Sequence, residues 1–217
     1  MTLLQAFGIH KNKINWKHPL SIGIGLVFPH ILLICFILVV GRLILQEKSG
    51  IFSDELIYNS LLEIICYTIL TISLVLILYY IRVNLFISIT LAAIICRIPD
   101  IITGYYTTTS IILNIITIVL FLIIFQSILK TEKSPPVGLI MSFLIAILIS
   151  RIISNLIYII HVYRHFGKEA ILNNVENGEI LNKLGRDIMT GLILTLFVMI
   201  GYLISRKMLL KQDTHGS

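Results

Sequence analysis

The chain has 217 residues, of which 57% are hydrophobic and only 13% charged, and its mean hydropathy is +0.98. A soluble domain carries roughly 25% charged residues, so this composition excludes an ordinary soluble protein. The net charge of +6 does not indicate nucleic-acid binding, because the Lys and Arg residues are spread over both ends and the loops. The length allows six spans of about 20 residues each. We therefore expect an all-α polytopic membrane protein, a bundle of six transmembrane helices.

The apolar runs follow one another along the chain with short polar connections. Residues 1–19 form a basic segment, and no small-residue cleavage site follows the first apolar run, so this run is expected to be an uncleaved span. The expected spans are about 20–41, 56–81, 85–104, 110–129, 138–163 and 187–205, which together make one domain over residues 20–205. The longest connection, 164–186, is expected to form short amphipathic turns on the outer membrane surface or, alternatively, a solvated loop. Residues 206–217 form the expected tail.

The charges in the connections predict an orientation. Nine cations lie on the side of both termini, namely Lys11, Lys13, Lys17, Arg82, Lys130, Lys133, Arg206, Lys207 and Lys211. Six lie on the opposite side, namely Arg42, Lys48, Arg164, Lys168, Lys183 and Arg186. Because cytoplasmic loops carry the excess of Lys and Arg, we expect both termini in the cytoplasm and the protein in a cell membrane, in contact with membrane lipids.

Four ionisable residues lie inside the expected spans: Glu63, Arg97, Asp100 and Arg151. An Arg or Asp at the bilayer centre costs at least about 2.5–3.5 kcal/mol, so these side chains are expected to avoid lipid. Two are positive and two are negative, which allows them to neutralise one another. Arg97 and Asp100 are three residues apart on one helix and can pair directly. We expect the second pair to join Arg151 to Glu63.

Polar residues recur at helical spacing around these charges. The stripes are Asn59, Glu63, Tyr67 and Thr71 on the second span, Thr90, Ala93, Arg97, Asp100 and Gly104 on the third, and Arg151, Ser154, Asn155 and Tyr158 on the fifth. Such faces typically lie between membrane helices, so spans two, three and five are expected to converge on a polar cluster that opens outward. The expected substrate-binding residues are Glu63, Arg97, Asp100, Arg151, Asn155 and Tyr158. The alternative is that the charges only fix the fold.

The sequence contains no pattern that predicts a cofactor. It has no HExxH helix and no nucleotide-binding loop, and Cys35, Cys66 and Cys96 each lie inside an apolar run without a CxxC motif. Cysteines in such runs usually behave as small buried hydrophobic residues. We therefore expect no bound metal or cofactor.

The favoured function is a small permease, a substrate-binding membrane subunit or a transporter accessory, the last two with other membrane subunits as partners. Arg97 and Arg151 would then bind an anionic group, or one carboxylate would carry a proton. An intramembrane enzyme acting on a lipid or peptide is the first alternative, with Glu63 or Asp100 as the acid–base group. A non-catalytic scaffold or immunity-type protein is the second alternative.

Overall fold

The computed structural model of the chain describes residues 2–10, 13–44, 54–81, 83–104, 106–132 and 134–210. Five of the cations that predict the orientation lie outside the described residues, namely Lys11, Lys48, Arg82, Lys133 and Lys211. Residues 211–217 of the expected tail also lie outside them.

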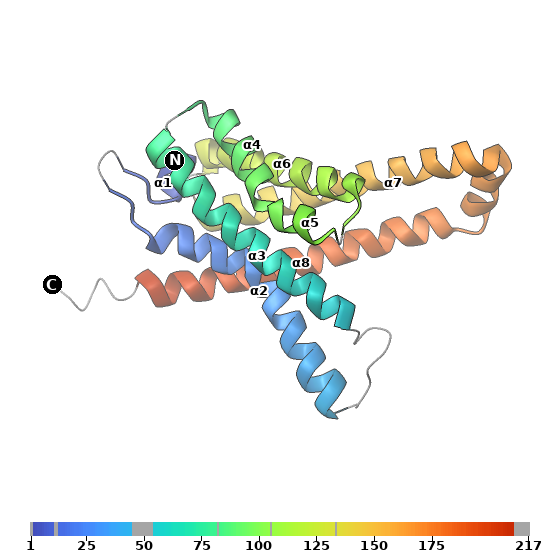
Figure 1. Ribbon diagram of the computed structural model, residues 1–217, viewed down its shortest axis with the longest axis horizontal. Coiled ribbons are helices and arrows are strands. Elements are labelled where there is room, and N and C mark those ends of the chain that lie inside the picture. The colour runs from blue at the N-terminus through green and yellow to red at the C-terminus, as the bar shows by residue number, and fades with distance from the viewer. Residues whose placement is uncertain are drawn as a thin grey trace.

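The described residues form an almost entirely helical molecule (Figure 1). In chain order the helices are α1 (Leu3–Ala6), α2 (Lys17–Phe36), α3 (Asp54–Leu76), α4 (Leu85–Cys96), α5 (Ile98–Thr103), α6 (Thr108–Glu132), α7 (Pro135–Glu176) and α8 (Glu179–Leu210). Two π-helical stretches, η1 (Ile37–Ile44) and η3 (Ile77–Ile81), prolong α2 and α3. The expected all-α class is confirmed.

Six of these helical segments are long and apolar enough to cross a membrane. They are Lys17–Val40, Asp54–Ile81, Leu85–Thr103, Thr108–Thr131, Pro135–Glu169 and Asn182–Leu209. The third is built from α4 and α5 together. This third span begins shortly after the second span ends. The Asn84 side chain caps the start of α4 by accepting a hydrogen bond from the Phe86 amide at 2.9 Å. The protein is thus a multi-pass helical membrane protein with six spans.

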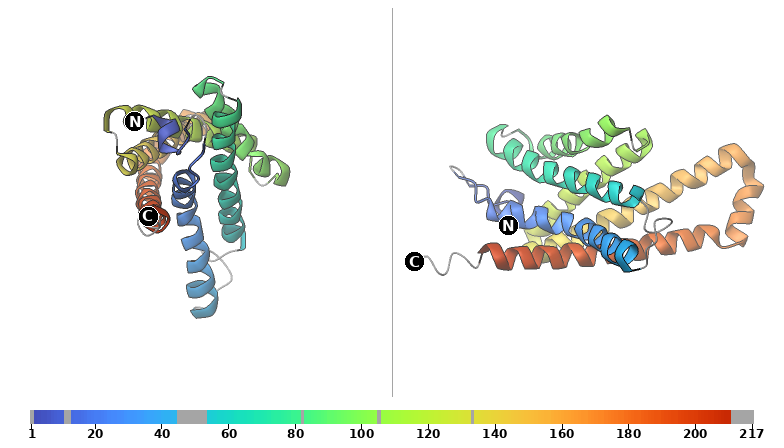
Figure 2. Two further views of the ribbon diagram at one scale, coloured as in Figure 1. Left: turned by 90° about the vertical axis from the view of Figure 1, so that its left-hand side faces the viewer. Right: turned by 60° about the horizontal axis from the view of Figure 1, so that its bottom comes forward.

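The six spans form a closed ring (Figures 1 and 2). Each span packs against the next one along the chain, from α2 through α3, α4, α6 and α7 to α8, and α8 packs against α2. Short connections favour this order, because consecutive helices then lie antiparallel and adjacent. The end of the ring at which α2 begins and α8 ends is called the proximal end here, and the opposite end the distal end. Toward the distal end, the α2–α3 and α7–α8 hairpins diverge (Figure 1).

Small residues close the ring between α2 and α8. Ser21 and Gly25 are four residues apart on α2, as are Gly201 and Ser205 on α8, and this spacing lets membrane helices approach closely. A Cβ atom added to Gly25 would lie 3.0 Å from the Cβ of Tyr202, and one added to Gly201 would overlap Phe28. The Ser205 hydroxyl also donates a hydrogen bond to the Ser21 carbonyl at 3.1 Å.

The N-terminal segment is folded onto the ring. Thr2 and Gln5 form a reciprocal capping box around α1, the arrangement that commonly begins a helix. Leu3 and Phe7 are almost fully buried, and the Leu3 amide donates to Oε1 of Gln126 on α6 at 2.5 Å. The segment expected as a basic cytoplasmic extension therefore contributes apolar side chains to the core.

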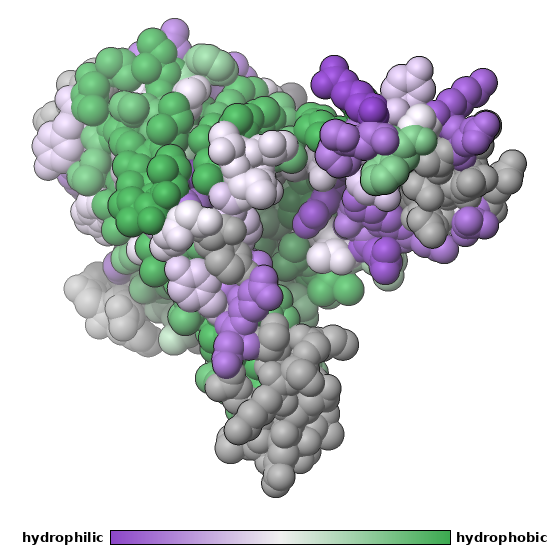
Figure 3. Space-filling view, turned by 45° about the vertical axis from the view of Figure 1, so that its right-hand side comes forward, coloured by the Kyte–Doolittle hydropathy of each residue, from purple (hydrophilic) through white to green (hydrophobic). Residues whose placement is uncertain are grey.

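The α7–α8 hairpin continues beyond the other helices at the distal end (Figure 2). α7 runs to Glu176 with a break at Gly167, whose φ is +80°, and α8 begins at Glu179 after Gly178, whose φ is +71°. The stretch 164–186, which the sequence assigns to an external loop, is thus mostly helical. Figure 3 shows hydrophilic residues gathered over this hairpin, in contrast to the apolar surface of the spans.

Candidate functional site

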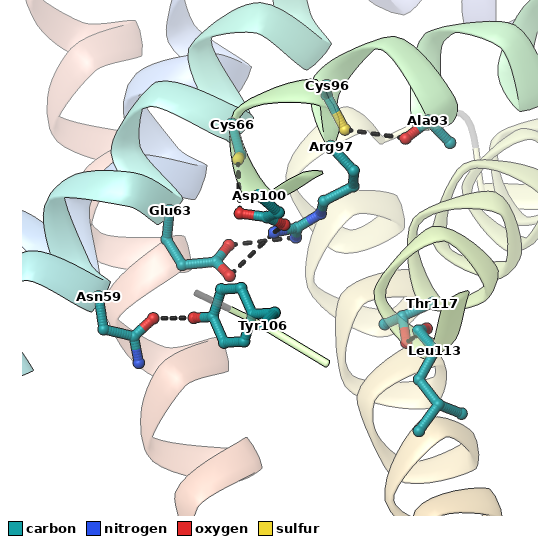
Figure 4. Close-up of polar contacts among 10 residues, drawn as sticks. All are labelled: Asn59, Glu63, Cys66, Ala93, Cys96, Arg97, Asp100, Tyr106, Leu113 and Thr117. Carbon is teal, nitrogen blue, oxygen red and sulfur yellow. Dashed lines mark hydrogen bonds and ion pairs between the residues drawn. The ribbon is translucent and has the colours of Figure 1, made fainter. Parts of the chain in front are cut away.

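The third span is interrupted where its charged residues lie. Pro99 lacks an amide proton, and its ring would clash with the carbonyl four residues earlier, so a continuous helix is unfavourable here. α4 ends at Cys96 and α5 begins at Ile98, and Arg97 lies between them with non-helical dihedral angles of φ −95° and ψ 5°. This break positions the Arg97 side chain toward α3 (Figure 4).

Glu63, Arg97 and Asp100 form a buried ion cluster (Figure 4). Nη1 of Arg97 donates to Oε1 of Glu63 at 2.9 Å and to Oδ2 of Asp100 at 3.0 Å, and Nη2 donates to Oε2 of Glu63 at 3.1 Å. The two parallel bonds to Glu63 make a bidentate pair, the strongest arrangement for a guanidinium and a carboxylate. Asp100 is fully buried and also accepts from the Cys66 thiol at 3.5 Å. Two carboxylates therefore face one guanidinium.

A cavity of about 420 Å³ lies inside the ring, next to the ion cluster. Its wall is formed by Leu26, Pro29, His30, Asn59, Glu63, Tyr67, Arg97, Tyr106, Ser110, Leu113, Asn114, Thr117, Phe143, Ile147, Ser150, Arg151, Ser154 and Leu194. Residues from all six spans contribute, and most of the polar ones carry a hydroxyl, amide or charged group. Tyr106 and Ser110 lie where α5 passes into α6, so the cavity reaches the distal end of the ring. Its volume is in the range of small-molecule sites, roughly 300–1,000 Å³.

The structure brings four of the six expected binding residues together. Glu63, Arg97 and Arg151 line the cavity, and Asp100 lies directly behind Arg97. The expected Arg97–Asp100 pair is confirmed. The expected Glu63–Arg151 pair is wrong, because Arg97 takes both oxygens of the Glu63 carboxylate.

Arg151 itself is partly buried on α7. Its guanidinium has no hydrogen-bond or ion-pair partner within the described parts of the chain, although its carbonyl accepts a hydrogen bond from Asn155. The cavity wall thus carries one paired cation, Arg97, and one cation without an ion-pair partner among the described residues, Arg151.

Asn155 and Tyr158 lie on the other side of the predicted stripe, against α8. The Asn155 amide donates to Asp187 Oδ2 at 3.1 Å and to the Arg151 carbonyl at 2.8 Å. The Lys183 ammonium lies 3.9 Å from the centre of the Tyr158 ring, a cation–π contact. Both residues connect α7 to α8, and neither lines the cavity beside the ion cluster.

Several wall residues are missing from the sequence-based prediction. Ser110, Asn114 and Thr117 on α6 contribute polar groups, and Thr117 donates to the Ser150 hydroxyl on α7 at 2.7 Å. These three residues follow four- and three-residue spacing, so the same stripe argument applied to the fourth span would have found them. Tyr106 donates to the Asn59 side chain (Figure 4), a contact with no local signal in the sequence.

Within the described residues, no group of three or more His, Cys, Asp and Glu side chains is arranged to hold a metal ion. Cys66 and Cys96 are buried, and the Cys96 thiol donates to the Ala93 carbonyl at 3.2 Å instead of facing the cavity (Figure 4). Comparison with protein-family models, with curated proteins and with solved structures finds no significant match to this chain.

Proposed function

We propose that the protein is a small permease, or the solute-binding membrane subunit or accessory of a transporter, and that it binds a small polar solute in the cavity inside the ring. The observation that carries this proposal is the contrast between the two surfaces of the spans. Apolar residues such as Ile102, Ile152 and Leu196 are exposed on the outside, while hydroxyl, amide and charged groups from the second to the fifth span line an internal cavity. A polar interior of this size in a membrane bundle suits a hydrated ligand.

The pairing of the charges favours this proposal over the two alternatives. An acid–base enzyme needs a carboxylate free to exchange a proton with its substrate, whereas Glu63 and Asp100 both accept hydrogen bonds from Arg97. A scaffold would be expected to pair all of its intramembrane charges in a dry core. Arg151 instead lines an open volume, with no counter-ion among the described residues.

The proposal includes a cellular location and partners. We place the protein in a cell membrane with both termini in the cytoplasm, because the loop cations favour that orientation. Membrane lipids surround the spans, and further membrane subunits are expected if the chain acts as a subunit or accessory. The distal end, which the cavity reaches, then faces outward.

Cysteine accessibility tests the proposal. In a background where the exposed Cys35 is replaced by serine, Ser154→Cys places a thiol in the cavity wall. Ile152→Cys is the matched control, because Ile152 is 53% exposed on the lipid-facing side of the same helix. A membrane-impermeant methanethiosulfonate reagent should modify Ser154→Cys but not Ile152→Cys.

Whether the reagent reacts from one side of the membrane or from both distinguishes a permease from a solute-binding subunit or accessory. A permease alternates between two packings of its helices, so Ser154→Cys should react in right-side-out and in inverted vesicles. Reaction from the distal side alone would support a solute-binding subunit or accessory. An unreactive Ser154→Cys in a folded protein, from either side, would contradict a water-filled cavity and with it the proposed function.

A further inference from the structure

The two arginines of the cavity wall differ in whether their guanidinium groups are paired with carboxylates, and this difference indicates the class of ligand. Arg97 is 2% exposed and its guanidinium is shared between two carboxylates. Both terminal nitrogens of Arg97 are engaged by these carboxylates, so an anion that approached them would have to displace Glu63 from a bidentate pair and leave its carboxylate uncompensated. Arg97 is therefore a structural cation, and its neighbours already satisfy its charge.

Arg151 has the opposite character. It lies near the middle of the long helix α7, lines the same cavity, and has no ion-pair or hydrogen-bond partner for its side chain among the residues that the structure describes. A charged side chain inside a membrane span is costly and is normally compensated by a partner or by a cavity ligand. A guanidinium presents a rigid fork of donors whose geometry matches a carboxylate or phosphate group.

The surroundings of Arg151 suit an oxyanion. Ser150 and Ser154 flank it on α7, and Asn114 of α6 lies in the same wall. Hydroxyl and amide groups can donate to the oxygens that a guanidinium leaves free. Glu63, which also lines the wall, has both oxygens engaged by Arg97, so its carboxylate does not occupy the donors of Arg151.

Resting on the proposed function, we propose that Arg151 binds the anionic group of the ligand, a carboxylate or a phosphate, and that Arg97 does not bind it. The group belongs to a small organic or inorganic anion or to the headgroup of an anionic lipid, since both present the same oxygens to the guanidinium. A cavity of about 420 Å³ accommodates either of them.

The first experiment measures ligand-induced stabilisation, because a ligand that binds the folded state raises its melting temperature. The full-length protein in neutral phosphatidylcholine nanodiscs is titrated with inorganic phosphate, glutarate and, as neutral probes, glycerol and glucose, at constant ionic strength. At least one of the two anions should raise the melting temperature, and the neutral probes should not. Repeating the measurement with phosphatidylglycerol in the nanodisc tests a lipid source.

Substitution of the arginine makes the assignment specific. Arg151→Gln should weaken binding of the effective anion about 10- to 100-fold, since a hydrogen bond to a charged group is lost, and Arg151→Lys should weaken it less. The control is Arg164→Gln, which removes an exposed arginine farther along α7 and should leave binding unchanged. Equal binding by wild type and Arg151→Gln would overturn the proposal.

A second measurement does not depend on the folding of an arginine variant. In the Ser154→Cys protein that retains Arg151, an anionic methanethiosulfonate should react faster, relative to a cationic one, than it does at an exposed control cysteine. Phosphate, glutarate or phosphatidylglycerol should slow this reaction. If neutral solutes protect Ser154→Cys while anions do not, the solute-binding function stands and the anionic class is wrong. If Ser154→Cys is unreactive toward every reagent, both proposals fail.

Discussion

Arg97 and Glu63, 34 residues apart in the sequence, form a bidentate ion pair with nitrogen–oxygen distances of 2.9 and 3.1 Å. The pair joins the second span to the third at the point where the third is broken. Removing one partner from a buried pair typically costs about 3–5 kcal/mol, because the other charge stays buried and loses its counter-ion. The pair therefore has a central place in the stability of the ring.

A double-mutant cycle measures this relationship. Arg97→Gln should lower the free energy of unfolding strongly, because it leaves two carboxylates without a cation. Glu63→Gln should lower it less, because Arg97 keeps Asp100 as a partner, and the double variant should lose less than the sum of the two. The matched cycle combines Glu63→Gln with Arg151→Gln and should be additive, because Arg151 does not contact Glu63. Steric trapping or reversible unfolding in micelles gives the energies. Strong coupling in the second cycle and none in the first would contradict the observed pairing.

The hydroxyl contact between Thr117 and Ser150 should be far weaker. The two oxygens are 2.7 Å apart, and the Leu113 carbonyl, also 2.7 Å from the Thr117 hydroxyl, competes for its single proton. Interhelical hydrogen bonds of this kind in membrane proteins are worth about 0.6 kcal/mol on average. A cycle of Thr117→Val and Ser150→Ala should give a coupling energy near that value, and one above about 2 kcal/mol would show that the contact matters more to α6–α7 packing than its geometry indicates.

The contact between α2 and α8 should not tolerate larger side chains. Gly201→Ala adds a Cβ that would overlap Phe28, and overpacking of this kind typically costs about 1–3 kcal/mol. Gly185→Ala is the control on the same helix, because a Cβ there meets nothing within 4 Å and alanine favours the helical conformation. Thermal denaturation should show a lower melting temperature for Gly201→Ala only. An unchanged value would mean that the two helices can separate at no cost.

The folded N-terminal segment should contribute to stability. Phe7 is 2% exposed and belongs to the core, so Phe7→Ala should cost about 3–5 kcal/mol, the usual range for a buried phenylalanine. Leu4→Ala removes a neighbouring apolar side chain that is 39% exposed and should have little effect. The melting temperatures of the two variants provide the comparison, and similar values would show that the segment does not pack as described.

Local rules predict part of the ion cluster from the sequence. The three-residue spacing of Arg97 and Asp100 fixes their pairing, since such residues are neighbours on any helix. The polar stripes on the second and third spans correctly predict that Glu63 lies near them. The choice between Arg97 and Arg151 as its partner could not be predicted, because it depends on how α3, α4 and α7 are rotated about their axes, and on the break at Pro99, which turns Arg97 toward α3.

The polar stripe on α7 shows the same limit. Its residues share one side of the helix, but that side is wide enough to face two neighbours. Arg151 and Ser154 line the cavity, whereas Asn155 and Tyr158 contact α8. Which residues face an opening and which face a helix is decided by the packing of the whole ring. The burial of α1 could not be predicted locally either, because it depends on contacts with α6.

The hydrogen bond between Ser205 and Ser21 joins the last span to the first, and it does so at the end of the ring where α2 starts and α8 finishes. Every span of the ring therefore packs against two neighbouring spans, including the first and the last. Joining the end of α8 to the segment that precedes α1 and reopening the chain between α6 and α7 would leave every pair of neighbouring helices in place. A circular permutant cut there would insert its spans in a new order and still be able to assemble the same enclosure.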